Sequence, residues 1–111
     1  MTDITPERIA KIAEWMGLRP VGISRGILYI EGIYNENLDD FEEIPFDPIN
    51  NPADAWRVLE HVTAAGLRYV EMCTEEVDIH NNTTGEILAS AHGANQREAL
   101  CAAVLEMIDA D

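Results

Sequence analysis

Three side chains in the second half of the sequence are of the types that bind divalent cations. Glu76, Asp78 and His80 alternate along a predicted strand, so a regular strand directs all three to one face. Carboxylate oxygens and an imidazole nitrogen can together hold such an ion. Alternate residues on a strand lie about 7 Å apart, too far for all three to meet one ion without a bulge or ligands from elsewhere. We therefore interpret them as the solvated outer face of a hairpin and predict no metal and no cofactor.

No other group of residues has the spacing of a known catalytic site. Glu71 is an acid bracketed by apolar residues, so one interpretation is a desolvated carboxyl of the kind that a catalytic pair needs. We expect it instead to pair with an arginine such as Arg68 or to lie at a sheet edge. The three histidines, His61, His80 and His92, are scattered, which is typical of structural or surface positions. The sequence contains no Gly-x-Ser-x-Gly elbow and no phosphate-binding glycine loop. It therefore predicts that the protein is not an enzyme.

The excess of acidic side chains argues against two classes of binding partner, nucleic acids and anionic membranes. The 111 residues include 21 acidic and 7 basic side chains, for a formal net charge of −14. Nucleic acids and anionic membranes need clustered lysine and arginine, so direct binding to either is not expected. No apolar run approaches the roughly 18 residues that span a bilayer. The start of the sequence lacks the features of a signal peptide, which predicts a cytoplasmic protein.

The acidic charge is concentrated in residues 35–50, which we predict to be a loop. It contains two prolines and six carboxylates, and no lysine or arginine occurs between Arg25 and Arg57. One interpretation is a solvated loop that keeps the protein soluble. The other is a surface that imitates the phosphate array of a nucleic acid and binds a basic cleft. Under the second interpretation, the partner-binding residues are Glu36, Asp39, Asp40, Phe41, Glu42, Glu43, Phe46 and Asp47.

Capping residues predict three helices. Thr5 with Pro6 begins a helix over residues 6–16, and Asn51 with Pro52 begins a second that ends at Gly66. Asn95, followed three residues later by a glutamate, begins the third. The apolar and β-branched pattern predicts one or two strands in residues 21–34 and one long strand in residues 67–80. Residues 86–91 are predicted to form the hairpin partner of that long strand.

These elements predict a single α+β domain over residues 1–111 in the order α-β-α-β-β-α. Apolar residues on both faces of the strand in residues 67–73 indicate a small antiparallel sheet with helices on both faces, a three-layer sandwich. Cys73 and Cys101 each lie in an apolar pattern, so we expect two reduced core thiols and no disulfide.

Two segments resemble the phage α-β-α sandwich domain family. Residues 46–62 (FDPINNPADAWRVLEHV) are similar to the start of its central helix, and residues 91–105 (AHGANQREALCAAVL) to its last strand and closing helix. Residues 13–17 (AEWMG) are compatible with its first helix. The chain departs from the family pattern in residues 21–50, where a short link is usual. The resemblance implies a sheet flanked by helices and a phage or prophage origin, and it carries over no site residues.

These observations together predict a non-enzymatic phage or prophage accessory protein. Small acidic phage proteins often block host machinery, so the expected partner is a host protein with a basic surface, such as a nucleic-acid-binding or defence component. The alternatives are a protein that binds or sequesters a nucleotide and a small domain with no dedicated ligand site. A nucleotide site would need convergent cations, drawn from Arg19, Arg25, Arg57, Arg68, Arg97, His61 and His92. The sequence leaves open whether the chain forms a homodimer.

Overall fold

Three helices and six strands make up the protein, and the computed structural model describes residues 4–110. The elements follow in the order α1 (Pro6–Trp15), β1 (Pro20–Ser24), β2 (Ile27–Asn35), β3 (Asp40–Phe46), α2 (Pro52–Val62), a 3₁₀ turn (Ala64–Gly66), β4 (Arg68–Met72), β5 (Glu76–Asn81), β6 (Ile87–His92) and α3 (Gln96–Asp109). The predicted capping side chains accept hydrogen bonds from backbone N–H groups in the first turn of each helix: Thr5 from Arg8, Asn51 from Ala53 and Asn95 from Glu98. The starts of all three predicted helices are therefore confirmed.

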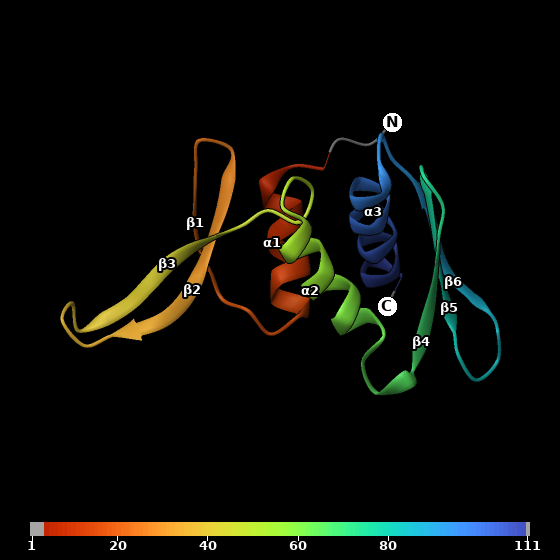
Figure 1. The fold of residues 1–111 in the computed structure, drawn as a ribbon, viewed down its shortest axis with the longest axis horizontal. Helices are drawn as coiled ribbons and strands as arrows, with labels where there is room; N and C mark the ends of the chain where they lie inside the picture. Colours follow the sequence, from red (N-terminus) through yellow and green to blue (C-terminus); the bar gives the residue numbers. More distant parts are fainter. Residues whose placement is uncertain (1–3, 111) are drawn as a thin grey trace.

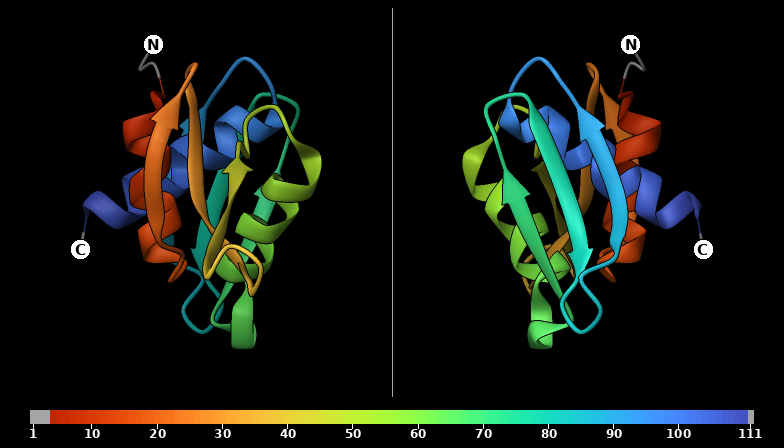
Figure 2. Two further views of the ribbon diagram at one scale, coloured as in Figure 1. Left: turned by 90° about the vertical axis from the view of Figure 1, so that its left-hand side faces the viewer. Right: turned by 90° about the vertical axis from the view of Figure 1, so that its right-hand side faces the viewer.

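The strands form two separate antiparallel sheets. The first sheet has the order β1-β2-β3 and the second has the order β4-β5-β6. The helices lie between the two sheets (Figure 1). α1 packs on β1 and β2, α3 packs on β5 and β6, and both α1 and α2 contact α3. The two views of Figure 2 show one sheet on each outer face of the molecule.

The predicted α+β class, with antiparallel strands in a sandwich-like stack, is confirmed. The order of the layers is a further finding, since the helices occupy the middle and the sheets the outside. α3 shows why. Its buried residues are more numerous than one helix stripe provides: Ala99, Leu100, Cys101, Ala103, Val104, Leu105 and Met107. A helix that is apolar around much of its circumference needs partners on several sides, and the second sheet, α1 and α2 supply them.

The predicted long strand over residues 67–80 is wrong, because the chain reverses in the middle of it. β4 and β5 are two strands of one hairpin, in which Arg68 pairs with Asn81 and Met72 with Val77. The backbone N–H of Cys73 donates to the carbonyl of Glu76 over 2.8 Å and closes the turn. This turn leaves Cys73 exposed, which corrects its assignment to the core, whereas Cys101 is buried as predicted. The loss of apolar residues after Cys73 therefore reflects a turn.

The predicted acidic loop over residues 35–50 is also corrected, because its central part is β3. β3 pairs with β2 as a hairpin that includes Leu28 opposite Phe46 and Ile30 opposite Ile44. Burying these four apolar side chains against the helices fixes the register, even though most of β3 is acidic and exposed. Of residues 35–50, only 36–39 and 47–50 remain outside regular structure. Within residues 4–110, no helix is both long and apolar enough to cross a membrane.

Candidate protein-binding site

The far end of the β2–β3 hairpin projects away from the helices (Figure 1). We call residues 32–43 the arm. At its base the register shifts: Glu31 pairs with Glu43 and Tyr34 with Phe41, so Gly32 and Ile33 together oppose the single residue between those partners. Such a bulge increases the local twist of a hairpin and changes the direction of its side chains. The arm therefore leaves the plane of the sheet at a defined point.

Glycine is required at this bulge by close packing. A Cβ at residue 32 would lie 3.0 Å from the carbonyl oxygen of Glu42 and 3.1 Å from Cγ2 of Ile44. At the tip, the side chain of Asn35 accepts a hydrogen bond from the backbone N–H of Asn37 over 2.9 Å. Asp39 follows with a φ of 50°, a conformation that aspartate tolerates better than most residues. The sequence of the arm thus specifies its own turn.

Four large apolar side chains are exposed on the arm. Ile33 is 80% exposed and Leu38 68% exposed, and Tyr34 and Phe41 are each nearly half exposed. The rings of Tyr34 and Phe41 pack edge to face, with centroids 5.3 Å apart and an interplanar angle of 73°. The hydroxyl of Tyr34 donates a hydrogen bond to Asp39. This hydrogen bond raises the pKa of Tyr34 above its usual value and, with the ring packing, ties the two strands to the turn.

Five exposed carboxylates lie on the same arm: Glu36, Asp39, Asp40, Glu42 and Glu43. No ion pair within residues 4–110 joins any of them to a lysine, arginine or histidine. Leu38 and Phe41 line one shallow hollow together with Asp40, Glu42 and Glu43. Exposed apolar side chains beside charged ones are the combination found in protein interfaces, which have an apolar core and a polar rim.

The structure places two of the predicted partner-binding residues elsewhere. Phe46 is fully buried in the core, with the guanidinium of Arg57 5.9 Å from its ring centroid, so it cannot anchor a partner. Asp47 lies in the turn before α2, where its carboxylate accepts a hydrogen bond from the side chain of Asn50 over 3.0 Å. Sequence reasoning did not select Ile33, Tyr34 or Leu38 as partner-binding residues. The signal that could have pointed to Ile33 and Tyr34 is Gly32, which lies at the bulge beside them.

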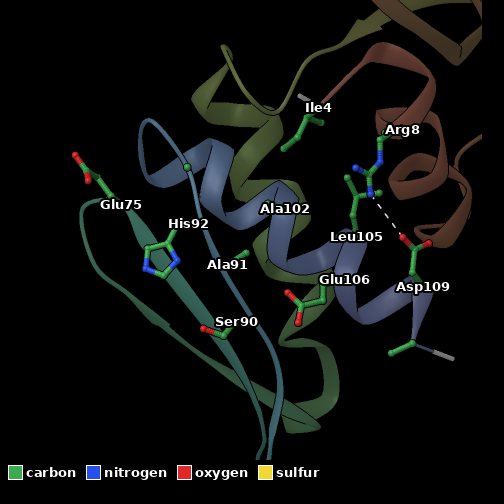
Figure 3. Close-up of a pocket in the computed structure, with 12 residues that line it drawn as sticks. Ile4, Arg8, Glu75, Ser90, Ala91, His92, Ala102, Leu105, Glu106 and Asp109 are labelled. Atoms are coloured by element: carbon green, nitrogen blue, oxygen red, sulfur yellow. Dashed lines mark ion pairs between the residues drawn. The ribbon is translucent and has the colours of Figure 1, made fainter. Parts of the chain in front are cut away.

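A groove of about 900 Å³ lies away from the arm, between α1, α3 and the end of β6 (Figure 3). Arg8 pairs with Asp109 across it, with 3.6 Å between nitrogen and oxygen. Its other charged and titratable lining residues are Glu75, His92 and Glu106. Because three carboxylates face one arginine there, the groove does not favour an anionic ligand.

Four of the five arginines that a nucleotide site would draw on have separate partners. Arg19 pairs with Glu31, and Arg57 pairs with Asp54. The side chains of Arg68 and Arg97 donate to the backbone carbonyls of Val62 and Ile49 over 3.0 and 2.8 Å. These four arginines hold elements of the fold together, so nothing in their placement favours the nucleotide alternative.

Glu76, Asp78 and His80, which the sequence analysis interpreted as a solvated face, are divided between two groups on the second sheet. Glu76 faces His92, with 3.8 Å between oxygen and nitrogen. Asp78 and His80 instead join Glu71, which reaches them from β4 rather than pairing with Arg68. Comparison with known proteins adds no assignment: no family, no curated protein and no solved structure matches the chain. The resemblance to phage sandwich domains therefore stays a prediction.

Proposed function

We propose that the chain is a non-enzymatic binding protein whose arm docks on a basic surface of a partner protein. The observation that carries the proposal is the combination, on one projecting hairpin, of four exposed apolar side chains and five carboxylates without internal ion pairs among residues 4–110. Buried apolar contacts supply most of the affinity in interfaces of this kind, and complementary charge supplies selectivity and association rate.

The chemistry of the arm defines the partner. An apolar recess rimmed by lysine and arginine would cover the side chains of Leu38 and Phe41 and pair with the carboxylates beside them. Proteins that bind nucleic acid present such basic surfaces, and the net charge of −14 steers the chain toward them over long distances. A host nucleic-acid-binding or defence protein is also the partner class that the phage resemblance implies.

The test compares two variants that carry the same net charge. The arm variant is E36Q/D40N/E42Q/E43Q, and the control variant E14Q/E60Q/E86Q/E106Q changes four exposed acids outside the arm. Each chain is immobilised and incubated with a bacterial lysate, and captured proteins are quantified by mass spectrometry. We expect the wild-type and control chains to capture the same basic protein and the arm variant to lose it.

Two further measurements separate the apolar and charged contributions. The variant I33S/L38S keeps every charge and should lose capture, because the apolar centre of the interface is gone. Raising the salt from about 0.1 M to about 1 M shortens the Debye length from about 10 to about 3 Å and should weaken capture by the wild-type chain. Equal capture by the arm and control variants, or an empty capture at low salt, would refute the proposal. Size-exclusion chromatography with light scattering shows whether the occupant of the arm is a second copy of the chain.

A further inference from the structure

The outer face of the second sheet brings together side chains from all three of its strands. On β4 and β5, Tyr69 lies opposite His80 and Glu71 lies opposite Asp78. Asp78 also lies opposite Ser90 on β6. The alternate residues of β5, Val77 and Ile79, are completely buried against the helices. Because strand side chains alternate between faces, the polar group lies on the face turned away from α3.

Three potential ligand atoms in this group lie close together. One side-chain oxygen from Glu71, one from Asp78 and one ring nitrogen of His80 are all within 4.8 Å of one another. The distance between Nε2 of His80 and Oε1 of Glu71 is 3.5 Å. The 7 Å spacing that argued against a site on one strand does not apply, because Glu71 reaches the other two side chains from the neighbouring strand.

His80 makes this group more than a cluster of acids. His80 is only 8% exposed, and its Nε2 atom is buried without a hydrogen-bond partner among residues 4–110. On the other side of the ring, Nδ1 lies 3.5 Å from the carbonyl oxygen of Gly85. The ring of Tyr69 stacks on the imidazole with centroids 4.5 Å apart and an interplanar angle of 2°. The ring is therefore held in place with Nε2 directed at the carboxylates.

A buried polar nitrogen without a partner is costly, so Nε2 needs an occupant. When Nδ1–H faces a carbonyl, Nε2 carries the lone pair and can bind a metal ion, an arrangement that fixes the tautomer of metal-binding histidines. The carboxylate of Asp78 is also held by a neighbouring side chain, because Ser90 Oγ donates a hydrogen bond to its Oδ1 over 2.5 Å. Each of these two potential ligands is thus oriented by a second group, as in established metal sites.

We propose that Glu71, Asp78 and His80 bind a divalent transition-metal cation of the Zn²⁺ class. One imidazole and two carboxylates are ligands that suit such a cation, and they leave a coordination position for water. Ligand atoms about 2.1 Å from one ion lie no more than about 4.2 Å apart, so the cluster must contract slightly. The Glu71 side chain is 63% exposed and is free to supply this movement.

The competing occupant of Nε2 is a proton, which would make His80 an imidazolium paired with Glu71. A titration with ZnCl₂ distinguishes the two. The metal-free full-length chain carries C73S, because the exposed Cys73 thiol could itself bind Zn²⁺. Isothermal titration calorimetry gives the affinity and stoichiometry, and ¹⁵N NMR of the histidine rings reports which nitrogen binds. We expect one Zn²⁺ per chain and a large shift of His80 Nε2 alone.

Variants assign the ligands. E71Q, D78N and H80Q should each weaken Zn²⁺ binding by about tenfold or more, a loss of the size seen even for outer partners of metal ligands. E71Q changes an exposed side chain, so it keeps the fold even if H80Q does not. The matched control is E76Q/H92Q, which removes the other histidine–carboxylate pair of the same sheet and should bind Zn²⁺ like the parent chain.

A second cation tests the role of the imidazole. Mg²⁺ prefers oxygen ligands and should not compete with Zn²⁺ at equal concentration. The proposal is overturned if no saturable Zn²⁺ binding occurs below about 1 mM, which corresponds to about −4 kcal/mol. It is equally overturned if E71Q binds like its parent, or if E76Q/H92Q loses as much affinity as E71Q.

Discussion

The carboxylate of Asp54 accepts a hydrogen bond from the backbone N–H of Asp47 over 2.9 Å. Asp54 is in the first turn of α2 and is only 7% exposed, and Asp47 is the first residue after β3. The contact therefore fixes the direction of the chain between the base of the hairpin and the helix. Arg57 approaches the other carboxylate oxygen to 3.8 Å and supplies an opposite charge.

Replacing Asp54 by alanine should lower the free energy of unfolding by about 1–3 kcal/mol. The loss leaves the Asp47 N–H without its acceptor and removes an acid from the positive end of the helix dipole. Asp54→Asn keeps an oxygen acceptor and should recover part of the loss. Urea unfolding followed by circular dichroism measures both. Glu60→Ala, at an exposed position of the same helix, should change the value by less than about 0.5 kcal/mol, and an equal effect at both positions would contradict the assignment.

The helices could be predicted because their start signals are local. Thr5, Asn51 and Asn95 each bond to a backbone group within three residues, so the sequence around each cap contains all the information needed. The end of the second helix is different. The chain leaves α2 at Val62, and Ala65 takes a φ of 59° where Gly66 was expected to end the helix. There the carbonyl of Val62 accepts a hydrogen bond from the side chain of Arg68 and that of Gly66 from Asn82, so partners outside the helix contribute to its end.

The two sheets could be predicted only in part, because the apolar pattern of a segment does not show where the chain reverses within it. Residues 67–80 look continuous, yet a three-residue turn divides them and places Glu71 beside Asp78. The same holds for the acidic segment, where pairing with β2 makes a strand of residues that have low strand propensity. Both candidate sites depend on such pairing, so their individual residues were visible in the sequence and their juxtaposition was not.

Gly93 should tolerate no side chain. A Cβ there would lie 2.6 Å from the backbone nitrogen of Ala99 and 3.0 Å from the carbonyl carbon of Glu98, and backbone atoms in a helix cannot move aside easily. Gly93→Ala should therefore lower the free energy of unfolding by about 1–3 kcal/mol. The control is Gly22→Ala, where a Cβ meets nothing within 4 Å and should cost little. Thermal unfolding midpoints compare the two, and equal midpoints would show that the Gly93 contact is not close.

The hydrogen bond from Tyr34 to Asp39 should be visible in the ionisation of the phenol. The carboxylate stabilises the protonated phenol, so the pKa of Tyr34 is raised and phenolate forms only above the usual pH. Asp39→Asn removes the charge and keeps a side chain that suits a positive φ, so it should lower the pKa of Tyr34. Ring ¹³C NMR resolves Tyr34 from the other tyrosines. An unchanged titration in Asp39→Asn would show that the arm does not keep this turn.

The two thiols should differ sharply in reactivity. Cys73 is exposed in the β4–β5 turn, whereas Cys101 is buried in α3, and burial raises the pKa of its thiol to about 12. Since the thiolate is the reactive form, a thiol reagent at neutral pH should label one cysteine rapidly. Cys73→Ser should abolish the rapid phase. Rapid labelling that persists in Cys73→Ser would mean that α3 is open to solvent.

The same burial of Cys101 should make the protein less stable at high pH. In the unfolded chain the thiol ionises near its ordinary value of 9.0, whereas in the folded chain it stays protonated up to about 12. The stabilising contribution is therefore fully present below pH 9 and is lost as the pH rises toward 12. Between these values the unfolded state binds fewer protons, so the free energy of unfolding falls by about 1.4 kcal/mol per pH unit from this group. Urea unfolding at about pH 9, 10 and 11 measures the slope between the unfolded and folded pKa values of the thiol. Cys101→Ala removes the titrating group and should show a shallower decline, whereas parallel slopes would show that the thiol ionises without unfolding.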